Sequence, residues 1–299
     1  MTNAVTVDVE DYFQVSAFRH VIRYDDWGGM ESRVERNTQR VLDLLAEFNV
    51  QGTFFILGWI AERFPALVRS IQAAGHELGC HSYAHRLVHE LTPEEFHADT
   101  RRALRAIEDA SGVAIRAYRA PSFSITPRSV WAIEALIEMG FTIDSSVFPV
   151  HHDLYGFPDA PRQPFRIQMN AGSLIEFPPP TFGLGPWNLP VTGGGYLRLL
   201  PMGYQTWILR RVEKRNELAQ LYFHPWELDP DQPRMDGSWR SRFRHRKGLH
   251  RTEERLRRLL TEFRFGRLSN VLGNCKSMPE FVLSTSGTKQ FAALEVPGI

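Results

Sequence analysis

The sequence predicts an α/β fold in which parallel strands alternate with helices. Segments with strand patterns and segments with helical spacing follow one another from residue 5 to residue 144. Residues 52–58 are apolar on both faces, as in a parallel sheet that is covered on both sides. Acidic, histidine and arginine side chains come at or just after predicted strand ends, where barrels and doubly wound sheets both build their sites.

The first half of the chain supplies the clearest elements. Valines alternate along the first strand, which ends in acids. Gly75 is placed to end a helix, and Thr92-Pro93-Glu94-Glu95 is a capping box that opens the next one. The predicted elements are strand 5–10, helix 32–48, strand 52–58, helix 61–74, strand 77–79, helix 92–110, strand 115–119, helix 126–139 and strand 141–144.

The second half is less regular. Residues 149–201 are predicted as loops, because prolines and glycines interrupt every pattern, including Gly193-Gly194-Gly195-Tyr196. A helix is predicted over 202–212, and an apolar strand over 218–223 runs into His224. Residues 252–265 form an amphipathic helix.

The composition of the chain limits the classes of function that it can have. The chain has 299 residues and a formal net charge of +1, which argues against a nucleic-acid-binding protein. No apolar run reaches the 18 residues that a membrane helix needs, and two cysteines make no disulfide framework. The first residues lead directly into a strand pattern without a signal peptide, so a cytoplasmic protein is expected.

The composition shifts after Pro233. Residues 234–267 hold twelve Lys and Arg against four acids, which predicts a basic C-terminal extension over residues 233–299, after a catalytic domain over residues 1–232. The extension is expected to pack on the barrel, and its weakly patterned tail, residues 274–299, is expected to be mobile. Its basic residues form either a solvated helix face or a contact with an anionic glycan, lipid surface or partner.

A histidine pair is the centre of the predicted site. His81 and His85 are four residues apart, a spacing that places both rings on one side of a helical turn, within reach of one metal ion. The pair alone is weak, since His85 and His89 have the same spacing. It gains weight from the acids Asp8, Glu10 and Asp11, from Arg119, and from His224.

Taken in this order, the motifs resemble those of the NodB-type polysaccharide deacetylases, carbohydrate esterase family four. The resemblance covers roughly residues 4–230. It is closest to the branch found with exopolysaccharide gene clusters, on three motifs: Asp-Val-Glu-Asp-Tyr-Phe at residues 8–13, Tyr-Arg-Ala-Pro-Ser-Phe-Ser at 118–124, and Gly-Gly-Gly-Tyr at 193–196. It implies a distorted barrel of about seven strand–helix units, a divalent metal that is usually zinc, and removal of acetyl groups from N-acetylhexosamine residues.

The resemblance also implies roles. His81 and His85 would bind the metal with one carboxylate, for which Glu10 is favoured and Asp11 is the alternative, since side chains alternate along a strand. Asp8 would be the general base held by Arg119, and His224 the general acid, its ring fixed by Asp144. Three residues would contact the glycan: Pro121, Phe123 and Tyr196.

The first motif departs from the family's usual pattern. Its acids are spaced as Asp8, Glu10 and Asp11 instead of adjacent, as in a branch that includes a peptidoglycan deacetylase and cofactor-independent allantoinases. A small cyclic amide or ureide is therefore an alternative substrate, and a non-catalytic glycan-binding scaffold is a second alternative. For an N-acetylated glycan, a cytoplasmic location suggests a lipid-linked intermediate at the inner membrane face, with a peripheral membrane or polysaccharide-assembly partner. The oligomeric state is open.

Overall fold

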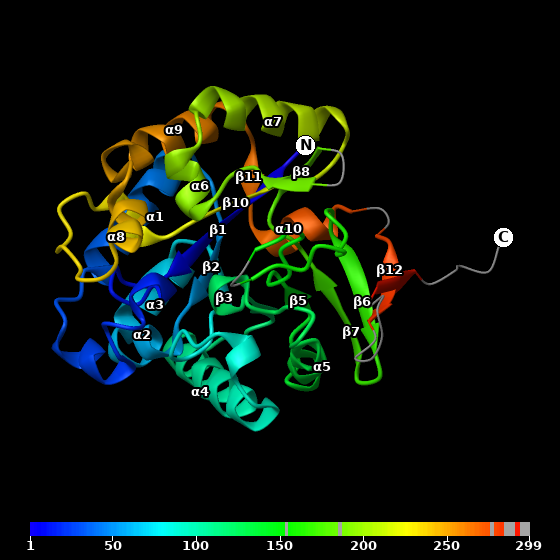
Figure 1. Ribbon diagram of the computed structural model, residues 1–299, viewed down its shortest axis with the longest axis horizontal. Helices are drawn as coiled ribbons and strands as arrows, with labels where there is room; N and C mark the ends of the chain where they lie inside the picture. The colour runs from blue at the N-terminus through cyan, green and yellow to red at the C-terminus, as the bar shows by residue number, and fades with distance from the viewer. Residues whose placement is uncertain (153–154, 185–186, 276–277, 284–290, 294–299) are drawn as a thin grey trace.

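A central sheet of parallel strands forms the body of the molecule (Figure 1). The computed structural model describes residues 1–152, 155–184, 187–275, 278–283 and 291–293. Seven parallel strands lie side by side in this order: β10 (Gln220–Phe223), β1 (Asn3–Val9), β2 (Thr53–Ile56), β3 (Glu77–Cys80), β4 (Ala117–Tyr118), β5 (Ile143–Asp144) and β7 (Gly172–Glu176). This arrangement confirms the predicted α/β fold class.

The barrel has one open seam. Among the described residues no backbone ladder joins β10 to β7. The side chain of Gln220, on β10, reaches across and donates a hydrogen bond to the carbonyl oxygen of Phe177, just after β7 (3.2 Å). A buried amide therefore connects β10 to the residue after β7 where no backbone ladder does, and the barrel is distorted in this sense.

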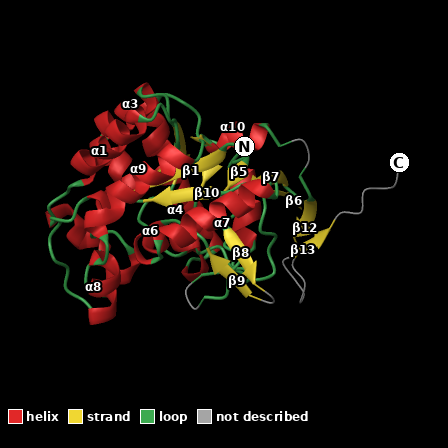
Figure 2. Ribbon diagram, turned by 90° about the horizontal axis from the view of Figure 1, so that it is seen from above, coloured by secondary structure: helices red, strands yellow, loops and turns green. Residues whose placement is uncertain are grey.

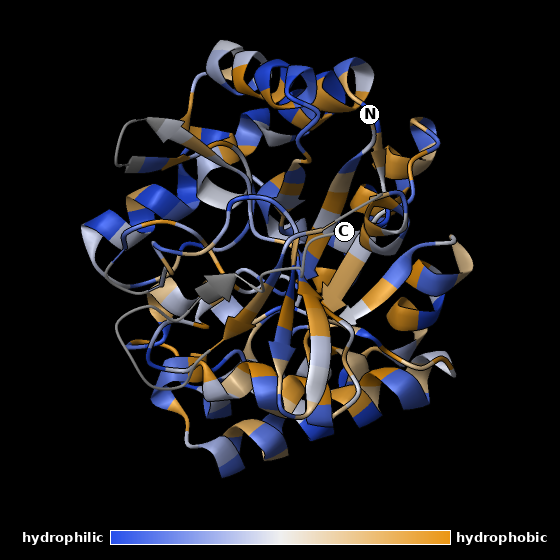
Figure 3. Cartoon of the chain, turned by 90° about the vertical axis from the view of Figure 1, so that its right-hand side faces the viewer, coloured by the Kyte–Doolittle hydropathy of each residue, from blue (hydrophilic) through white to orange (hydrophobic). Residues whose placement is uncertain are grey.

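Helices cover the outside of the sheet (Figures 1 and 2). Their apolar faces meet the strands in a continuous core, and in the hydropathy view the helices show alternating polar and apolar patches (Figure 3). The main covering helices are α1 (Val34–Glu47), α2 (Gly58–Arg63), α3 (Pro65–Ala73), α4 (Pro93–Ser111), α5 (Trp131–Glu138), α7 (Met202–Lys214) and α9 (Thr252–Glu262).

Two predicted helices are shorter than expected. The helix predicted over residues 61–74 is divided into α2 and α3 at Phe64, whose backbone leaves the helical region (φ −127°, ψ 56°). The following Pro65 disfavours helical geometry at the preceding residue, which explains the break. The helix predicted from residue 126 begins only at Trp131, because turns occupy the residues before it.

The segment predicted as loops contains regular structure. β6 (Phe165–Met169) and β7 form an antiparallel hairpin, and β8 (Thr181–Leu184) pairs with β9 (Trp187–Pro190). The glycine triplet opens a short helix, α6 (Gly194–Leu199). The prediction missed these elements because each is short and bordered by prolines or glycines, so its period is hard to detect locally.

The C-terminal residues add to the sheet. α8 (Trp239–Arg246) precedes α9, β11 (Phe265–Gly266) pairs with β1, and α10 (Leu268–Gly273) follows. Part of the tail expected to be mobile is regular: β12 (Glu280–Leu283) pairs with β6 and with β13 (Phe291–Ala293). Phe281 explains this pairing in part, since its ring packs edge-on against Phe165 at 5.5 Å. Residues 284–290 and 294–299 lie outside the described residues, and the domain boundary at residue 232 stays a prediction.

No helix in the described part of the chain is both long enough and apolar enough to cross a bilayer.

Candidate active site

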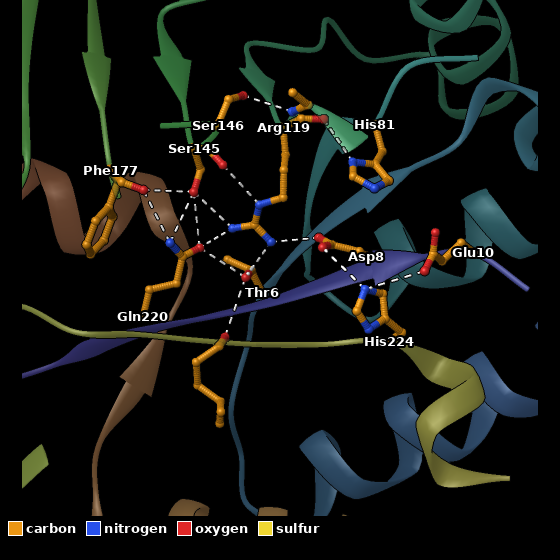
Figure 4. A network of polar contacts seen from close by, with 12 residues as sticks. Thr6, Asp8, Glu10, His81, Arg119, Ser145, Ser146, Phe177, Gln220 and His224 are labelled. Carbon is orange, nitrogen blue, oxygen red and sulfur yellow. Dashed lines mark hydrogen bonds and ion pairs between the residues drawn. The ribbon is translucent and has the colours of Figure 1, made fainter. Parts of the chain in front are cut away.

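The end of β1 separates three acids. Asp8 and Glu10 project into the barrel mouth beside His224 (Figure 4). Asp11 is instead hydrogen-bonded to the residues at the start of α1. The Asp11 carboxylate accepts hydrogen bonds from Ser32 Oγ (2.7 Å) and from the backbone N–H groups of Arg33 (2.8 Å) and Val34 (3.2 Å). It therefore satisfies the amino end of α1. This geometry favours Glu10 over Asp11 as a metal ligand.

The two histidines share a loop rather than a helical turn, so that part of the prediction is wrong. Ser82 and His85 both have positive φ (62° and 52°), and the Ser82 hydroxyl accepts a hydrogen bond from the His85 N–H (3.1 Å). The Asp99 carboxylate, on α4, accepts from the N–H groups of Tyr83 (2.8 Å) and Ala84 (3.3 Å). An acid from a neighbouring helix thus holds the loop in a shape that the four-residue spacing does not indicate.

Glu10, His81 and His85 form a group that could hold a metal ion. One ligand atom from each residue lies within 4.8 Å of the other two, and His85 Nε2 is 2.9 Å from Glu10 Oε2. His81 Nδ1 lies 2.8 Å from the Arg119 carbonyl oxygen, which fixes that nitrogen as the donor and leaves Nε2 to face the group. Two imidazoles and a carboxylate fit a catalytic zinc-type site with open positions.

The protonation of this group suits a cation. Burial lowers the pKa of His81 to about 4, so its ring is neutral at pH 7, as a ligand must be. Burial alone would raise the pKa of Glu10, but the His85 and His224 rings outweigh it and lower that pKa to about 2. The group therefore offers two nitrogens and a negative charge in a buried place.

Arg119 connects the barrel interior to Asp8. The guanidinium is fully buried and donates to Asp8 Oδ1 (2.6 Å), to Thr6 Oγ1 (2.9 Å) and to Ser145 Oγ (3.0 Å). It also donates to the side-chain oxygen of Gln220 and lies over the Phe55 ring at 4.2 Å. The structure thus brings Arg119 and Asp8 together as predicted, with Asp8 held between Arg119 and His224 (Figure 4).

His224 faces both acids of β1. Its Nε2 is 3.4 Å from Glu10 Oε1 and 3.8 Å from Asp8 Oδ2, and its Nδ1 is 3.2 Å from Glu227 Oε2. Burial would lower the pKa of His224, but the carboxylates of Glu10, Glu227 and Asp8 outweigh burial and raise the pKa to about 9. The ring is therefore protonated at neutral pH, as a general acid requires.

The residue that orients His224 is Glu227, and the role predicted for Asp144 is wrong. Asp144 lies at the end of β5 and accepts hydrogen bonds from Ser145 N (2.9 Å) and Ser146 Oγ (2.5 Å). Burial raises the pKa of Asp144 to about 6, and burial likewise raises the pKa of the neighbouring Glu176 carboxyl well above its usual value. Asp144 supports the strand ends beneath Arg119 rather than the His224 ring.

A buried arginine holds Glu227 in place. Arg198 Nε, on α6, donates to Glu227 Oε1 at 2.6 Å, while Glu227 Oε2 accepts from the His224 backbone N–H at 3.0 Å. Burial would raise the pKa of Glu227, but Arg198 and His224 outweigh it and lower the pKa to about 2. Trp226 completes this side of the site by donating from its indole to Glu10 Oε1 (3.2 Å).

The predicted substrate-contacting residues lie beside the site in an aromatic cluster. Phe123 packs edge-on against Tyr222 at 5.0 Å and lies 5.4 Å from the Arg119 guanidinium. Pro121 is buried at the start of the same short turn, and the Tyr196 hydroxyl lies 3.2 Å from that of Tyr155. Their contact with a glycan remains a prediction.

Sequence reasoning missed four residues that shape the site. The glutamate in His224-Pro225-Trp226-Glu227 stands three places after the capping residue, a capping-box spacing that could have indicated Glu227. No local signal marks the others, because their partners are more than ten residues away: Arg198, Asp99 and Gln220.

Fold and site together define the class: an α/β barrel with a His–His–carboxylate group and a flanking acid and base at the carboxyl ends of its strands. A family model described as polysaccharide deacetylase matches residues 18–142. Residues 18–142 therefore match the polysaccharide deacetylase family. A second model, a domain of unknown function (DUF3473), matches residues 145–273.

Curated relatives agree with this assignment. The chain is 33% identical over 98 residues to a peptidoglycan-N-acetylglucosamine deacetylase of Bacillus cereus, a match covering 32% of this chain and 36% of the relative. It is 33% identical over 99 residues to a chitooligosaccharide deacetylase of Bradyrhizobium sp., covering 33% and 43%. The chain thus spans less than half the length of these relatives.

One solved structure supports the fold over nearly the whole chain. It is the crystal structure of a Mycobacterium smegmatis protein assigned as a polysaccharide deacetylase, with a TM-score of 0.63 and 22% identity. The match covers 90% of this chain and 88% of that chain.

The candidate site crosses the family-model boundary. His81, His85 and Arg119 lie within the deacetylase match, whereas His224 and Glu227 lie within the second match. The candidate site therefore draws residues from both matched segments and, through Asp8 and Glu10, from the residues before them.

Proposed function

We propose that this chain removes N-acetyl groups from N-acetylglucosamine residues of a bacterial polysaccharide or of its lipid-linked precursor. The observation that carries the proposal is the meeting of a metal-type group, a carboxylate base and a protonated histidine at one end of the barrel. Amide hydrolysis needs all three functions. The amide carbonyl is a poor electrophile, so a metal and a base are needed to activate the carbonyl and the water, and the amine is a poor leaving group, so an acid is needed to protonate it. The relatives named as N-acetylglucosamine and chitooligosaccharide deacetylases support this substrate class.

Glu10, His81 and His85 would hold a divalent ion, which we propose to be zinc. When bound there, the ion would lower the pKa of a water molecule and polarise the amide carbonyl. Zinc suits a set of two imidazoles and one carboxylate. The ligand residues fit the ion because they are buried, close together and, for His81, neutral at pH 7.

Asp8 and His224 would move the protons. Asp8 Oδ1 is fixed by Arg119, which would orient the carboxylate to accept a proton from the attacking water. His224, fixed at Nδ1 by Glu227, would donate from Nε2 to the departing amine nitrogen. The products would be acetate and a glycan with a free amine.

The test is acetate release from a panel of N-acetylated oligosaccharides, with allantoin as a ureide control and with and without a chelator. We expect acetate from the glycans, loss of activity with chelator, and recovery with Zn²⁺. Asp8→Asn should lower turnover by at least about 100-fold while retaining metal, since the amide accepts no proton. Turnover of allantoin alone, or near-normal activity of Asp8→Asn, would contradict the proposal.

A further inference from the structure

α8 and the residues around it carry exposed rings and unpaired positive charge on one surface. We call this the α8 surface and define it by three exposed apolar residues and six basic ones: Val21, Trp239, Phe243, Arg234, Arg240, Arg242, Arg244, Arg246 and Lys247. It lies beside the long loop that follows β1, away from α4 and α7 (Figure 1). The proposed deacetylation does not use it.

The apolar part of the α8 surface is unusually exposed. Trp239 and Phe243, one helical turn apart, are 67% and 51% exposed, and Val21 is 49% exposed. Val21 belongs to the same place, since a Cβ built on Gly237 would lie 3.9 Å from its side chain. The rings border a hollow of about 590 Å³ whose floor includes Phe18 and Met235. Large apolar side chains gathered in water mark an interaction site.

The charge on the α8 surface is uncompensated. Between residues 234 and 247 six basic side chains face one acid, Asp236, and none of the six has an ion pair with any described residue. The arginines of the neighbouring helices differ: Arg40 and Arg257 pair with Glu253 and Glu47. Lys247 Nζ lies 5.5 Å from the Phe243 ring centre, so charge and apolar surface occur at the same point.

The α8 surface is held rigidly against the candidate site. Arg198 Nη1 donates to the carbonyl oxygens of Arg244 (2.9 Å), His245 (3.0 Å) and Lys247 (2.8 Å), which satisfies the carboxyl end of α8. The buried His245 ring packs on Phe18 at 4.9 Å and stacks on Trp226 at 4.4 Å. The same Arg198 and Trp226 contact Glu227 and Glu10, so α8 has a fixed position relative to the site.

We propose that the α8 surface docks this protein on a membrane surface of acidic phospholipids. Exposed Trp and Phe insert at the level of the head groups, and a cluster of Lys and Arg binds anionic lipid. The aliphatic Val21 and the apolar hollow distinguish this partner from a soluble acidic glycan, which would need hydrogen-bonding groups in their place. Docking would bring the barrel mouth to a membrane-borne substrate. The inference goes beyond the deacetylation and is tested without it.

The experiment measures binding of the full chain to vesicles by flotation. We expect binding to vesicles of phosphatidylcholine with phosphatidylglycerol, little binding to phosphatidylcholine alone, and a steep decrease with salt. Replacing Arg240, Arg242 and Arg244 together by Gln should weaken binding by about 100-fold, at roughly fivefold for each charge. The double variant Trp239→Ala, Phe243→Ala should also weaken it, and the blue shift of fluorescence on vesicle binding should decrease in Trp239→Phe.

Matched controls lie elsewhere on the surface. Arg69, Arg101 and Arg105, exposed on α3 and α4, are replaced together by Gln, and the 48%-exposed Trp207 on α7 by Ala. These variants should bind vesicles like the unsubstituted chain. The thermal unfolding midpoint of every variant is measured, so that a loss of binding is not due to unfolding. Absence of vesicle binding, equal loss in the controls, or tight binding to soluble alginate without binding to acidic vesicles would overturn the proposal.

Discussion

Glu10 and Asp11 are adjacent acids with different structural roles. The carboxylate of Glu10 faces three histidines and an indole, whereas that of Asp11 accepts hydrogen bonds at the start of α1. Both residues follow Val9, the last residue of β1, and the position of the Asp11 side chain depends on where α1 begins.

We therefore expect Glu10→Gln to lower the affinity for Zn²⁺ by more than about 100-fold, because a ligand charge is lost. Asp11→Asn, the charge-matched control, should keep that affinity within about threefold, since an amide oxygen still caps the helix. Calorimetric titration with Zn²⁺ measures both. Loss of metal in Asp11→Asn with retention in Glu10→Gln would reverse the assignment.

His224 and Glu227 form a second pair that can be tested at the residue scale. Glu227→Gln should lower kcat by at least about 10-fold with a smaller change in KM, because the ring loses the carboxylate that orients Nδ1. Asp144→Asn should have a smaller effect, since that carboxylate accepts hydrogen bonds from Ser145 and Ser146 and makes none with the His224 ring. Steady-state kinetics on samples with comparable unfolding midpoints decides between them; a larger effect of Asp144→Asn would restore the original prediction.

At the scale of the elements, the backbone at the start of α6 explains two of the three consecutive glycines at residues 193–195. Gly193 and Gly194 have positive φ (101° and 46°) and lie on the Tyr222 ring. A Cβ on Gly193 would lie 2.1 Å from that ring, whereas a Cβ on Gly195 would meet nothing within 4 Å. The first two positions require glycine because the backbone packs closely on the aromatic cluster there, whereas the third position has room for a side chain.

Gly193→Ala should lower the free energy of unfolding by about 2–4 kcal/mol, since strain and overpacking both act. Gly195→Ala, inside α6, should raise that free energy by about 0.5–1 kcal/mol, because alanine favours the helix. Denaturant unfolding measures both variants. Equal effects would show that packing on Tyr222 is not the reason for the glycine at position 193.

At the scale of the whole molecule, stability should depend on pH through a histidine at the other end of the barrel. His76 is buried, accepts a hydrogen bond at Nδ1 from the Gly52 N–H (3.0 Å) and lies 4.6 Å from the Phe54 ring centre. Burial, followed by the nearby Arg267 charge, lowers its pKa from 6.5 to about 4. Between these pH values the unfolded chain binds a proton that the folded chain does not, so stability falls as pH falls.

This one group should cost about 3 kcal/mol between pH 6.5 and pH 4. His76→Asn keeps an acceptor for Gly52 without titrating, so its unfolding free energy should fall less over that range. The exposed His250→Asn is the control and should follow the unsubstituted chain. The measurement is denaturant unfolding at a series of pH values; parallel curves for all three proteins would refute the assignment to His76.

The sequence by itself determined the strand–helix alternation and the positions of the acids and histidines at the strand ends, because these depend on local periodicity. It also indicated the family through Asp8, His81, His85 and Arg119. Only the tertiary structure decided the shape of the loop that carries the histidines and the hairpins within residues 149–201. It also decided that Glu227, and not Asp144, contacts the His224 ring. These depend on partners such as Asp99 and Arg198, which are distant in sequence and meet only when the barrel assembles. Local patterns record a residue's own period and do not record which distant group will satisfy its hydrogen bonds.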